Sequence, residues 1–173
     1  SDLTSYPTAT IVGLDMGYFA ACLTAANYLP ECRVDEQMFV DVRSVSKEML
    51  QGVDAVVYLA AILNDPMGAS FEAITLDVNH RAAVAIAQLA REAGAGSFVF
   101  ASSCSVYGFA EGGAKTEESA VNPLTAYAKS KVGAEQDLAA LARSNFAVTC
   151  LRFATACGMS ERLRLDLVLN DFV

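Results

Sequence analysis

The sequence predicts an α/β fold in which helices flank a doubly wound parallel sheet. Its apolar segments alternate between short β-branched runs and longer, alanine-rich amphipathic stretches, an alternation typical of parallel sheets with helical crossovers. Most of the short runs are apolar almost throughout, as expected of strands that are covered on both faces. No repeat, low-complexity tract or linker divides the 173 residues, so we expect a single domain.

Five strands and three helices are expected in chain order. The strands cover residues 8–14, 37–42, 55–60, 97–101 and 147–151, and the helices cover residues 45–51, 70–93 and 125–144. The second helix is expected to stop at Gly94, because glycine supplies the left-handed cap that precedes the next strand. Pro123 comes just before the third helix, where proline is tolerated. Residues 108–122 form a long loop rich in Gly, Glu and Thr, and such a loop in a compact domain usually has a function.

Charge and hydropathy exclude several classes of partner. Twenty acidic residues against twelve basic ones give a net charge of -8, which repels nucleic acid and anionic lipid surfaces. The longest unbroken apolar run, residues 55–63, has nine residues, about half of what a bilayer span requires. The chain also opens without a basic and apolar leader segment. We therefore expect a cytoplasmic protein that binds neither nucleic acid nor membrane.

The cysteines and the histidine predict neither a disulfide framework nor a metal site. The five cysteines are odd in number and no two of them form a C-x-x-C pair, which argues against both kinds of site. His80 is the only histidine, and we expect it on a helix surface in a structural role. Cys104 has no basic group near it in sequence that would activate a thiolate, so we expect it to pack as a small apolar side chain.

The strongest chemical pattern joins a serine segment at a strand end to a tyrosine and a lysine at a helix start. Ser103 follows the strand at residues 97–101, and Tyr127 and Lys131 stand four residues apart, on one face of the third helix. An ammonium group near a phenol favours phenolate, so Lys131 is expected to lower the pKa of Tyr127. Ser103 can then hydrogen-bond a substrate oxygen whose proton Tyr127 removes. A tyrosine and a lysine at this spacing alone are more often structural, but the order of strand, serines, loop and helix favours catalysis.

These residues resemble those of the extended short-chain dehydrogenase/reductase family, in its branch of NAD-dependent nucleotide-sugar epimerases and dehydratases. The resemblance extends over almost the whole chain. Residues 98–108 resemble the family's fifth strand and catalytic serine segment, and residues 54–61 resemble its fourth strand, which lies under the cofactor. Residues 77–79 resemble a helix whose asparagine supports the active-site backbone. Residues 39–43 resemble the strand end that meets the adenine, and residues 151–155 the sixth strand near the nicotinamide.

The resemblance implies a role for each matching residue. Tyr127 is the base, Lys131 holds the nicotinamide ribose and lowers the pKa of the tyrosine, and Ser103 orients the substrate. The implied cofactor is NAD and the implied substrate is a nucleotide-activated sugar, with hydride passing between a sugar carbon and the nicotinamide. Besides Tyr127 and Lys131, the residues implied in cofactor binding are Asp41, Val42, Leu59, Ala60, Ala61 and Asn79.

Asp15 joins the cofactor site through the count of strands. When the serine segment follows the fifth strand, residues 8–14 become the second strand and none is left for the first. An acid at that strand end accepts hydrogen bonds from the adenosine ribose and repels a 2′-phosphate, which favours NAD over NADP. Two alternatives stay open. Asp15 is an ordinary turn residue after Gly13, or residues 13–20, with G-x-x-x-G-x-x-A in place of G-x-x-G-x-x-G, form a degenerate phosphate loop.

The resemblance implies a Rossmann-like doubly wound parallel sheet, truncated at both ends. Residues 1–173 are then one NAD-binding domain from the second strand onward, with the substrate domain largely absent. We expect this chain alone to bind NAD weakly or not at all, because the backbone donors of a glycine loop anchor the pyrophosphate in the complete fold and no such loop is visible in this sequence. Dehydratases acting at sugar positions 4 and 6 place Asp-Glu where this sequence has Cys104 and Ser105, so epimerisation or simple oxidation is favoured. The family commonly forms homodimers through the second and third helices. The alternative is a non-catalytic dinucleotide- or partner-binding module.

Overall fold

A computed structural model describes residues 8–18, 33–63, 71–109 and 113–156 of the chain. The chain divides into two compact units, Ser1–Asp41 with Ala156–Val173, and Val42–Thr155. Each unit holds a parallel sheet, and helices connect the strands of the second, so the predicted α/β class is confirmed. Among the described residues, no helix combines the length and the apolar character that a bilayer crossing needs.

The first unit contains a two-stranded parallel sheet. β1 (Val12–Asp15) pairs with β2 (Glu36–Phe39). Both strands differ from the predicted ranges, because residues 8–11 precede β1 and residues 40–42 follow β2. Just before β1, the backbone N–H of Ile11 donates to Asp35 Oδ2 at 2.7 Å, and the Ile11 carbonyl accepts from the Asp35 N–H at 2.9 Å.

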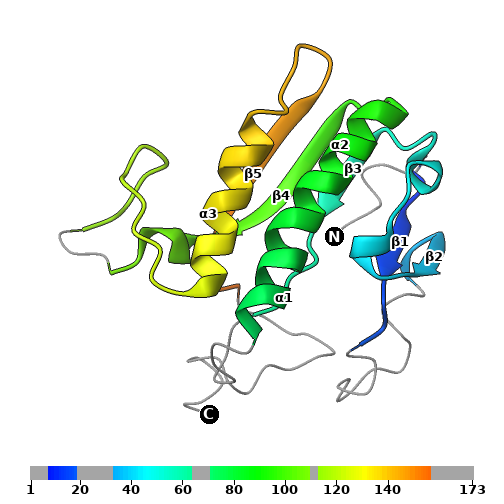
Figure 1. The fold of residues 1–173 in the computed structure, drawn as a ribbon. Coiled ribbons are helices and arrows are strands. Elements are labelled where there is room, and N and C mark those ends of the chain that lie inside the picture. The colour runs from blue at the N-terminus through cyan, green and yellow to red at the C-terminus, as the bar shows by residue number, and fades with distance from the viewer. Residues whose placement is uncertain (1–7, 19–32, 64–70, 110–112, 157–173) are drawn as a thin grey trace. The chain divides into compact units, whose positions relative to one another are not determined.

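The second unit is built on a three-stranded parallel sheet in the order β3-β4-β5 (Figure 1). β3 spans Ala55–Tyr58, β4 spans Ser97–Ser103 and β5 spans Ala147–Phe153, and each begins at the predicted residue. Phe98 and Phe100, on the central strand, are fully buried. Because all three strands run in the same direction, their carboxyl ends meet at one edge of the sheet.

Two helices supply the crossovers and pack on one face of this sheet (Figure 1). α2 (Ala83–Ala93) precedes β4, and α3 (Ala126–Ala139) lies between β4 and β5. Gly94 caps α2 in the left-handed conformation, with a φ of 98°, as the sequence predicts. On the opposite face of the sheet, Val57 and Phe153 are exposed. Within the described part of the chain, the helices therefore cover a single face.

The helix predicted at residues 70–93 contains a wider segment. α1 (Glu72–Leu76) continues into six residues of π-helix, Asp77–Ala82, before α2 begins, and residue 70 lies outside the described residues. A π-helical turn shifts the side chains that follow it onto a new face, and such turns are frequent at functional sites. Here the π-helix buries Asn79 completely.

Two predicted helices have different bounds in the structure. The prediction of an α-helix at residues 45–51 is wrong, because this range contains only a short 3-10 helix, Glu48–Leu50, and a second one, Val42–Ser44, ends before it. A helix of seven residues makes too few hydrogen bonds to offset the cost of nucleation. α3 ends at Ala139 and not at residue 144, because Arg143 and Phe146 form an antiparallel bridge that turns the chain into β5.

A short 3-10 helix, η8 (Cys104–Tyr107), follows β4 and leads into the predicted long loop. Gly108 begins that loop with φ 65° and ψ -139°, a conformation close to a region that essentially only glycine adopts. The Asn122 N–H donates to the carbonyl of Val106 at 2.9 Å and closes the loop at its base. A Cβ at Gly108 would lie 2.2 Å from the Asn122 carbonyl oxygen, so only glycine lets the loop ends meet here.

Gly108→Ala should destabilise the protein more than Gly52→Ala. Gly52 also has a positive φ, 76°, but nothing lies within 4 Å of an added Cβ, so its replacement adds only a backbone cost of about 1–2 kcal/mol. At Gly108 the contact with a backbone oxygen adds about 1–3 kcal/mol of overpacking. Urea denaturation of both variants measures the difference, and equal losses of stability would contradict this role of Gly108.

Candidate active site

Ser103 stands where β4 ends, at the carboxyl edge of the sheet. It is the N-cap of η8, and its Oγ accepts hydrogen bonds from the Ser105 N–H at 3.2 Å and from Ser105 Oγ at 2.9 Å. These local contacts hold a partly exposed hydroxyl at this edge. Ligands of open α/β sheets bind outside the carboxyl ends of the strands, so the position suits a group that contacts substrate.

Tyr127 lies in the first turn of α3, close enough to Ser103 for that side chain to lower the pKa of the phenol. Thr125 caps this turn, since its Oγ1 accepts a hydrogen bond from the Ala128 N–H at 3.1 Å. Burial raises the pKa of Tyr127, and the hydrogen bond with Ser103 partly counteracts that rise. The net shift of the Tyr127 pKa is therefore upward, because the phenol loses more solvation on burial than the Ser103 side chain returns.

Lys131 is an almost completely buried charged side chain, with only 1% of the residue exposed. Its Nζ donates to the Ala101 carbonyl at 2.7 Å. The same atom lies 5.5 Å from the ring centroid of Tyr127 and 4.6 Å from that of Phe100. Burial lowers the pKa of Lys131 to about 8. Because an ammonium group has three donors, Lys131 can keep its bond to Ala101 and still bind another oxygen.

Asn79 connects the segment after β3 to the helix that carries Tyr127. Its Oδ1 accepts a hydrogen bond from the Ile62 N–H at 2.7 Å, and its Nδ2 donates to the Ile62 carbonyl at 2.9 Å and to Ser130 Oγ at 3.3 Å. Ser130 Oγ in turn donates to the Tyr127 carbonyl at 2.7 Å. Asn79 is fully buried, so this geometry fits a residue that supports the site backbone.

The other predicted cofactor residues lie in two places. Residues 59–61 follow β3 at the same sheet edge and belong to the second unit. Val42 belongs to that unit as well, where it starts a 3-10 helix and packs against the core. Asp15 and Asp41 belong to the first unit. Asp15 Oδ1 accepts a hydrogen bond from the Gly17 N–H at 2.6 Å, a turn contact that leaves the alternative interpretation of Asp15 as a turn residue open.

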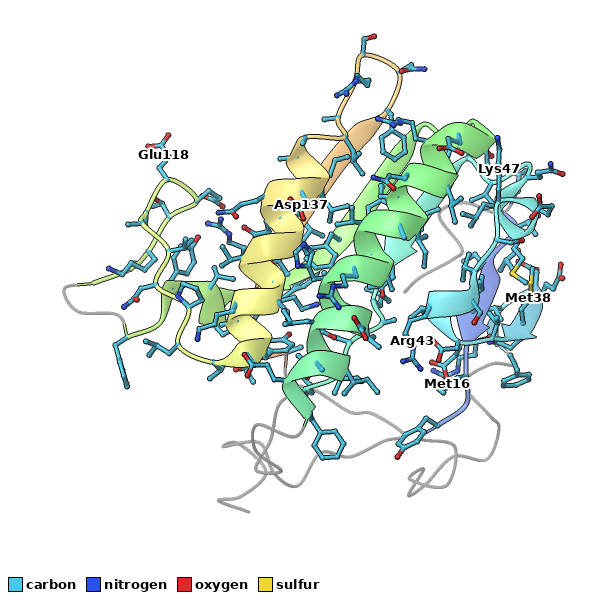
Figure 2. All side chains as sticks on the ribbon, viewed as in Figure 1. Met16, Met38, Arg43, Lys47, Glu118 and Asp137 are labelled. Atoms are coloured by element: carbon cyan, nitrogen blue, oxygen red, sulfur yellow. The ribbon has the colours of Figure 1, made fainter. Side chains whose placement is uncertain are left out.

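Two side chains outside the catalytic group test further predictions. His80, in the π-helix, contacts Asp137 on α3, with 2.6 Å between His80 Nε2 and Asp137 Oδ2. Asp137 lies on the side of α3 that is next to this helix (Figure 2). A Cβ at Gly133 would lie 2.9 Å from the His80 ring, so this close contact supports the predicted structural role of His80. Cys104 is exposed, and the expectation that it packs in the interior is wrong. No group of three metal-ligating side chains occurs in the described ranges.

A cavity of about 200 Å³ opens beside the serine segment. Hydroxyl groups and apolar side chains both line it, the combination that small-molecule sites commonly have. Its lining residues are Ser105, Gly108, Phe109, Leu124, Thr125 and Ala128.

Three further polar residues of this region, Ser130, Glu135 and Arg152, were missed in the sequence analysis. The sequence does contain a signal for Glu135, because the four-residue spacing from Tyr127 to Lys131 continues to it. No comparable signal exists for Arg152, since its contact with Glu135 joins a strand to a helix that precedes it.

Comparisons with known proteins point to one family. The sequence profile of the NAD dependent epimerase/dehydratase family matches residues 3–169. The solved structure of MoeE5 with UDP-glucose and NAD is 26% identical, with a TM-score of 0.79, over 98% of this chain and 53% of that chain. DesIV, a dTDP-glucose 4,6-dehydratase from Streptomyces venezuelae with NAD and TYD bound, is 26% identical, with a TM-score of 0.69, over 85% of this chain and 47% of that chain.

A third solved structure shares the fold at lower identity. The UDP-glucuronic acid 4-epimerase from Bacillus cereus in complex with NAD is 22% identical, with a TM-score of 0.81, over 97% of this chain and 54% of that chain. The chain thus spans about half the length of the solved structures that it matches.

Lys131 should make stability depend on pH between about 8 and 10.5. Its folded pKa is lowered from 10.5 to about 8, so within this window the unfolded chain holds a proton that the folded chain lacks, and the free energy of unfolding rises with pH. Below pH 8 the folded protein carries the full cost of the buried charge. Urea titrations at pH 7 and pH 10 should show that wild type gains about 2–3 kcal/mol relative to Lys131→Met.

Lys129→Met is the matched control for this measurement. Lys129 is an exposed lysine on the same helix, two positions from Lys131, so its charge is solvated in the folded and the unfolded chain. We expect the free energy of unfolding of Lys129→Met to differ from that of wild type by the same amount at pH 7 and at pH 10. If the difference in unfolding free energy between wild type and Lys131→Met were also the same at both pH values, the Lys131 amine would not be held in a desolvated site.

Proposed function

The chain belongs to the NAD-dependent epimerase/dehydratase family, and from this premise we propose that it is the NAD-binding part of an epimerase, or a dehydrogenase, of a nucleotide-activated sugar. The observation that carries the proposal is the group of Ser103, Tyr127 and Lys131 at the carboxyl edge of one sheet. A half-buried phenol beside a hydroxyl and a buried ammonium group is suited to acid/base chemistry. The similar structure of MoeE5 holds UDP-glucose and NAD, which supports the same ligand classes here.

The described residues fit the nicotinamide half of NAD. Lys131 has donor capacity beyond its bond to Ala101, and a ribose hydroxyl is an oxygen that an ammonium group can hold. NAD, when bound, supplies the acceptor for the hydride. Asn79 supports the backbone after β3 from the interior. The assignment is Tyr127 and Lys131 for the nicotinamide ribose, Leu59, Ala60 and Ala61 for the segment under the cofactor, and Asp15, Asp41 and Val42 for the adenosine half.

Tyr127 is the proposed base. It takes the proton from a sugar hydroxyl as hydride leaves the carbon that bears this oxygen, and Ser103 orients that oxygen by a hydrogen bond. The hydrogen bond from Ser103 and the positive charge of Lys131 favour the phenolate, whereas burial raises the pKa of Tyr127. The phenol therefore depends on both neighbours to lose its proton near neutral pH.

The residues that follow Ser103 favour epimerisation or simple oxidation over elimination of water. Elimination needs a positioned acid that protonates the departing hydroxyl. Residues 104 and 105 are a cysteine and a serine, and neither is a carboxylic acid. Cys104 is exposed, and the Ser105 hydroxyl is used in a hydrogen bond to Ser103 Oγ. The cavity beside Ser105 and Thr125 is the proposed position of the sugar.

A non-catalytic binding module is the alternative that the site disfavours. The burial of Lys131 lowers its pKa to about 8, and that desolvation has a cost in stability. A module that binds only a partner has no need of such a group next to a tyrosine and a serine. The cost is explained when the ammonium group acts on Tyr127 and on a cofactor hydroxyl.

We further propose that the protein acts in the cytoplasm as a homodimer. The outward faces of α2 and α3 carry small exposed side chains, Ala85 and Ala139, which allow another helix to approach closely. Sedimentation of the complete protein should show the dimer, and a monomer at high concentration would contradict it.

Tyr127→Phe should lower turnover by roughly two to four orders of magnitude, the range expected when a positioned base is removed. The ring and its packing remain, so stability should change little. The measurement is the rate of NADH formation or sugar interconversion by the complete protein that contains this chain, with a panel of nucleotide-sugars and NAD.

Two variants on the same helix control this experiment. Lys131→Ala should reduce both turnover and NAD affinity, because it removes a charge near the phenol and the proposed ribose contact. Lys129→Ala, at an exposed position of α3, should leave both unchanged. If Tyr127→Phe retained most of the turnover, Tyr127 would not be the base and the proposed function would fail.

A further inference from the structure

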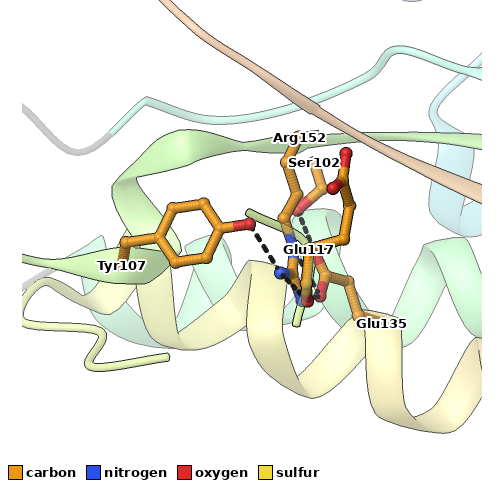
Figure 3. Close-up of polar contacts among 5 residues, drawn as sticks. All are labelled: Ser102, Tyr107, Glu117, Glu135 and Arg152. Carbon is orange, nitrogen blue, oxygen red and sulfur yellow. Dashed lines mark hydrogen bonds and ion pairs between the residues drawn. The ribbon is translucent and has the colours of Figure 1, made fainter. Parts of the chain in front are cut away.

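A partly buried ion pair joins α3 to β5 beside the serine segment (Figure 3). Arg152 Nη2 lies 2.7 Å from Glu135 Oε2, and Arg152 Nε donates to the two oxygens of the same carboxylate at 3.1 and 3.2 Å. The two side chains are 21% and 11% exposed. Arg152 Nη1 also donates to the Glu117 carbonyl at 3.2 Å. The guanidinium thus fixes the carboxylate at two points and ties the long loop to it.

The ion pair also holds the chain on both sides of Ser103. Ser102 Oγ donates to Glu135 Oε1, and Arg152 Nη1 donates to the Tyr107 hydroxyl at 2.8 Å (Figure 3). Ser102 directly precedes Ser103, and Tyr107 is the last residue of η8, the short helix that Ser103 caps. The serine segment is therefore anchored before and after its functional residue.

Glu135 lies on the helix that carries Tyr127 and Lys131. The three residues follow one another at intervals of four, so their side chains form one stripe along α3. This stripe contacts the last three residues of β4 in three ways. Lys131 donates to the Ala101 carbonyl, Glu135 accepts from Ser102 Oγ, and Tyr127 lies close enough to Ser103 for that serine to influence its pKa.

We propose that Glu135 and Arg152 are positioning residues that keep Ser103 within hydrogen-bonding distance of Tyr127 by holding the segments on both sides of the serine. Neither side chain is assigned a contact with the reacting atoms. The other hydrogen bonds of the Ser103 hydroxyl join it to Ser105. Because Ser105 belongs to η8, the helix that Ser103 caps, these bonds do not fix the serine relative to α3. The catalytic meaning of the pair rests on the proposed function, whereas the position of Ser103 against Tyr127 can be measured by itself.

The ionisation of Tyr127 reports this position. The hydrogen bond with Ser103 lowers the pKa of Tyr127, so a displaced serine should raise that pKa further. The described groups that face the phenol are Ser103, Cys104 and Lys131. The chain is labelled with carbon-13 at the tyrosine ζ carbons and titrated by NMR, and the Tyr127 signal is assigned with Tyr127→Phe. We expect the pKa to rise by about 0.5 or more in Arg152→Met, and by less in Tyr107→Phe, which removes one hydrogen bond.

Leu138→Ala distinguishes positioning from general stability. Leu138 is a fully buried core residue further along α3, so its truncation destabilises the protein through lost packing and should leave the pKa of Tyr127 unchanged. If Arg152→Met fails to fold, Arg152→Lys, which keeps the charge but loses the two-point contact, and Tyr107→Phe carry the same test. An unchanged Tyr127 titration in the folded Arg152 and Tyr107 variants would overturn the proposal. So would an equal shift in Leu138→Ala.

Kinetics of the complete protein separate this proposal from the proposed function. Where Tyr127→Phe lowers turnover by the expected orders of magnitude, Arg152→Lys should lower kcat by about tenfold or more, because the reacting groups are misaligned, with little change in KM for the nucleotide-sugar. A change confined to KM would contradict a positioning role. If Tyr127→Phe leaves turnover intact, the proposed function fails, while the NMR titration still decides whether the pair positions Ser103.

Discussion

The burial of one ammonium group governs the arrangement of the second unit. Lys131 is 1% exposed, and its hydrogen bond to the Ala101 carbonyl holds α3 against the end of β4. A charge in this place is costly, which is why its pKa is lowered to about 8. The fully buried rings of Phe98 and Phe100 belong to the apolar packing that offsets this cost. With α3 held in this way, Tyr127, one helical turn before Lys131, lies next to Ser103.

Other buried polar contacts extend this order in two directions. Asn79 reaches from the π-helix to the backbone of Ile62 and to Ser130, so the segment after β3 is held in register with α3. On the other side, Glu135 and Arg152 hold the residues that flank the serine. Each of these buried groups has its partners, and removal of one partner leaves a desolvated group that costs more than the lost bond. The site residues are therefore held by contacts from several elements at once.

The parts of the fold that depend on local sequence were predictable. The first residues of β3, β4 and β5 and the glycine cap of α2 follow from runs of apolar residues and one glycine, and the pairing of Tyr127 with Lys131 follows from helical spacing. The parts that depend on tertiary contacts were not. The π-helix that turns Asn79 inward, the raised pKa of Tyr127 and the partner of Arg152 arise from packing between elements far apart in the chain, and no local pattern reports them.

A crystal structure of the complete protein with NAD and a nucleotide-sugar bound tests the role of the Ser103, Tyr127 and Lys131 group most directly. We expect the Tyr127 hydroxyl and Ser103 Oγ to lie within about 3 Å of the same sugar oxygen, with Lys131 bound to the Ala101 carbonyl and to a ribose hydroxyl at once. A sugar whose oxygens lie beyond hydrogen-bonding distance of Tyr127, or a Lys131 that has left Ala101 and makes no contact with the ribose, would contradict the assignment.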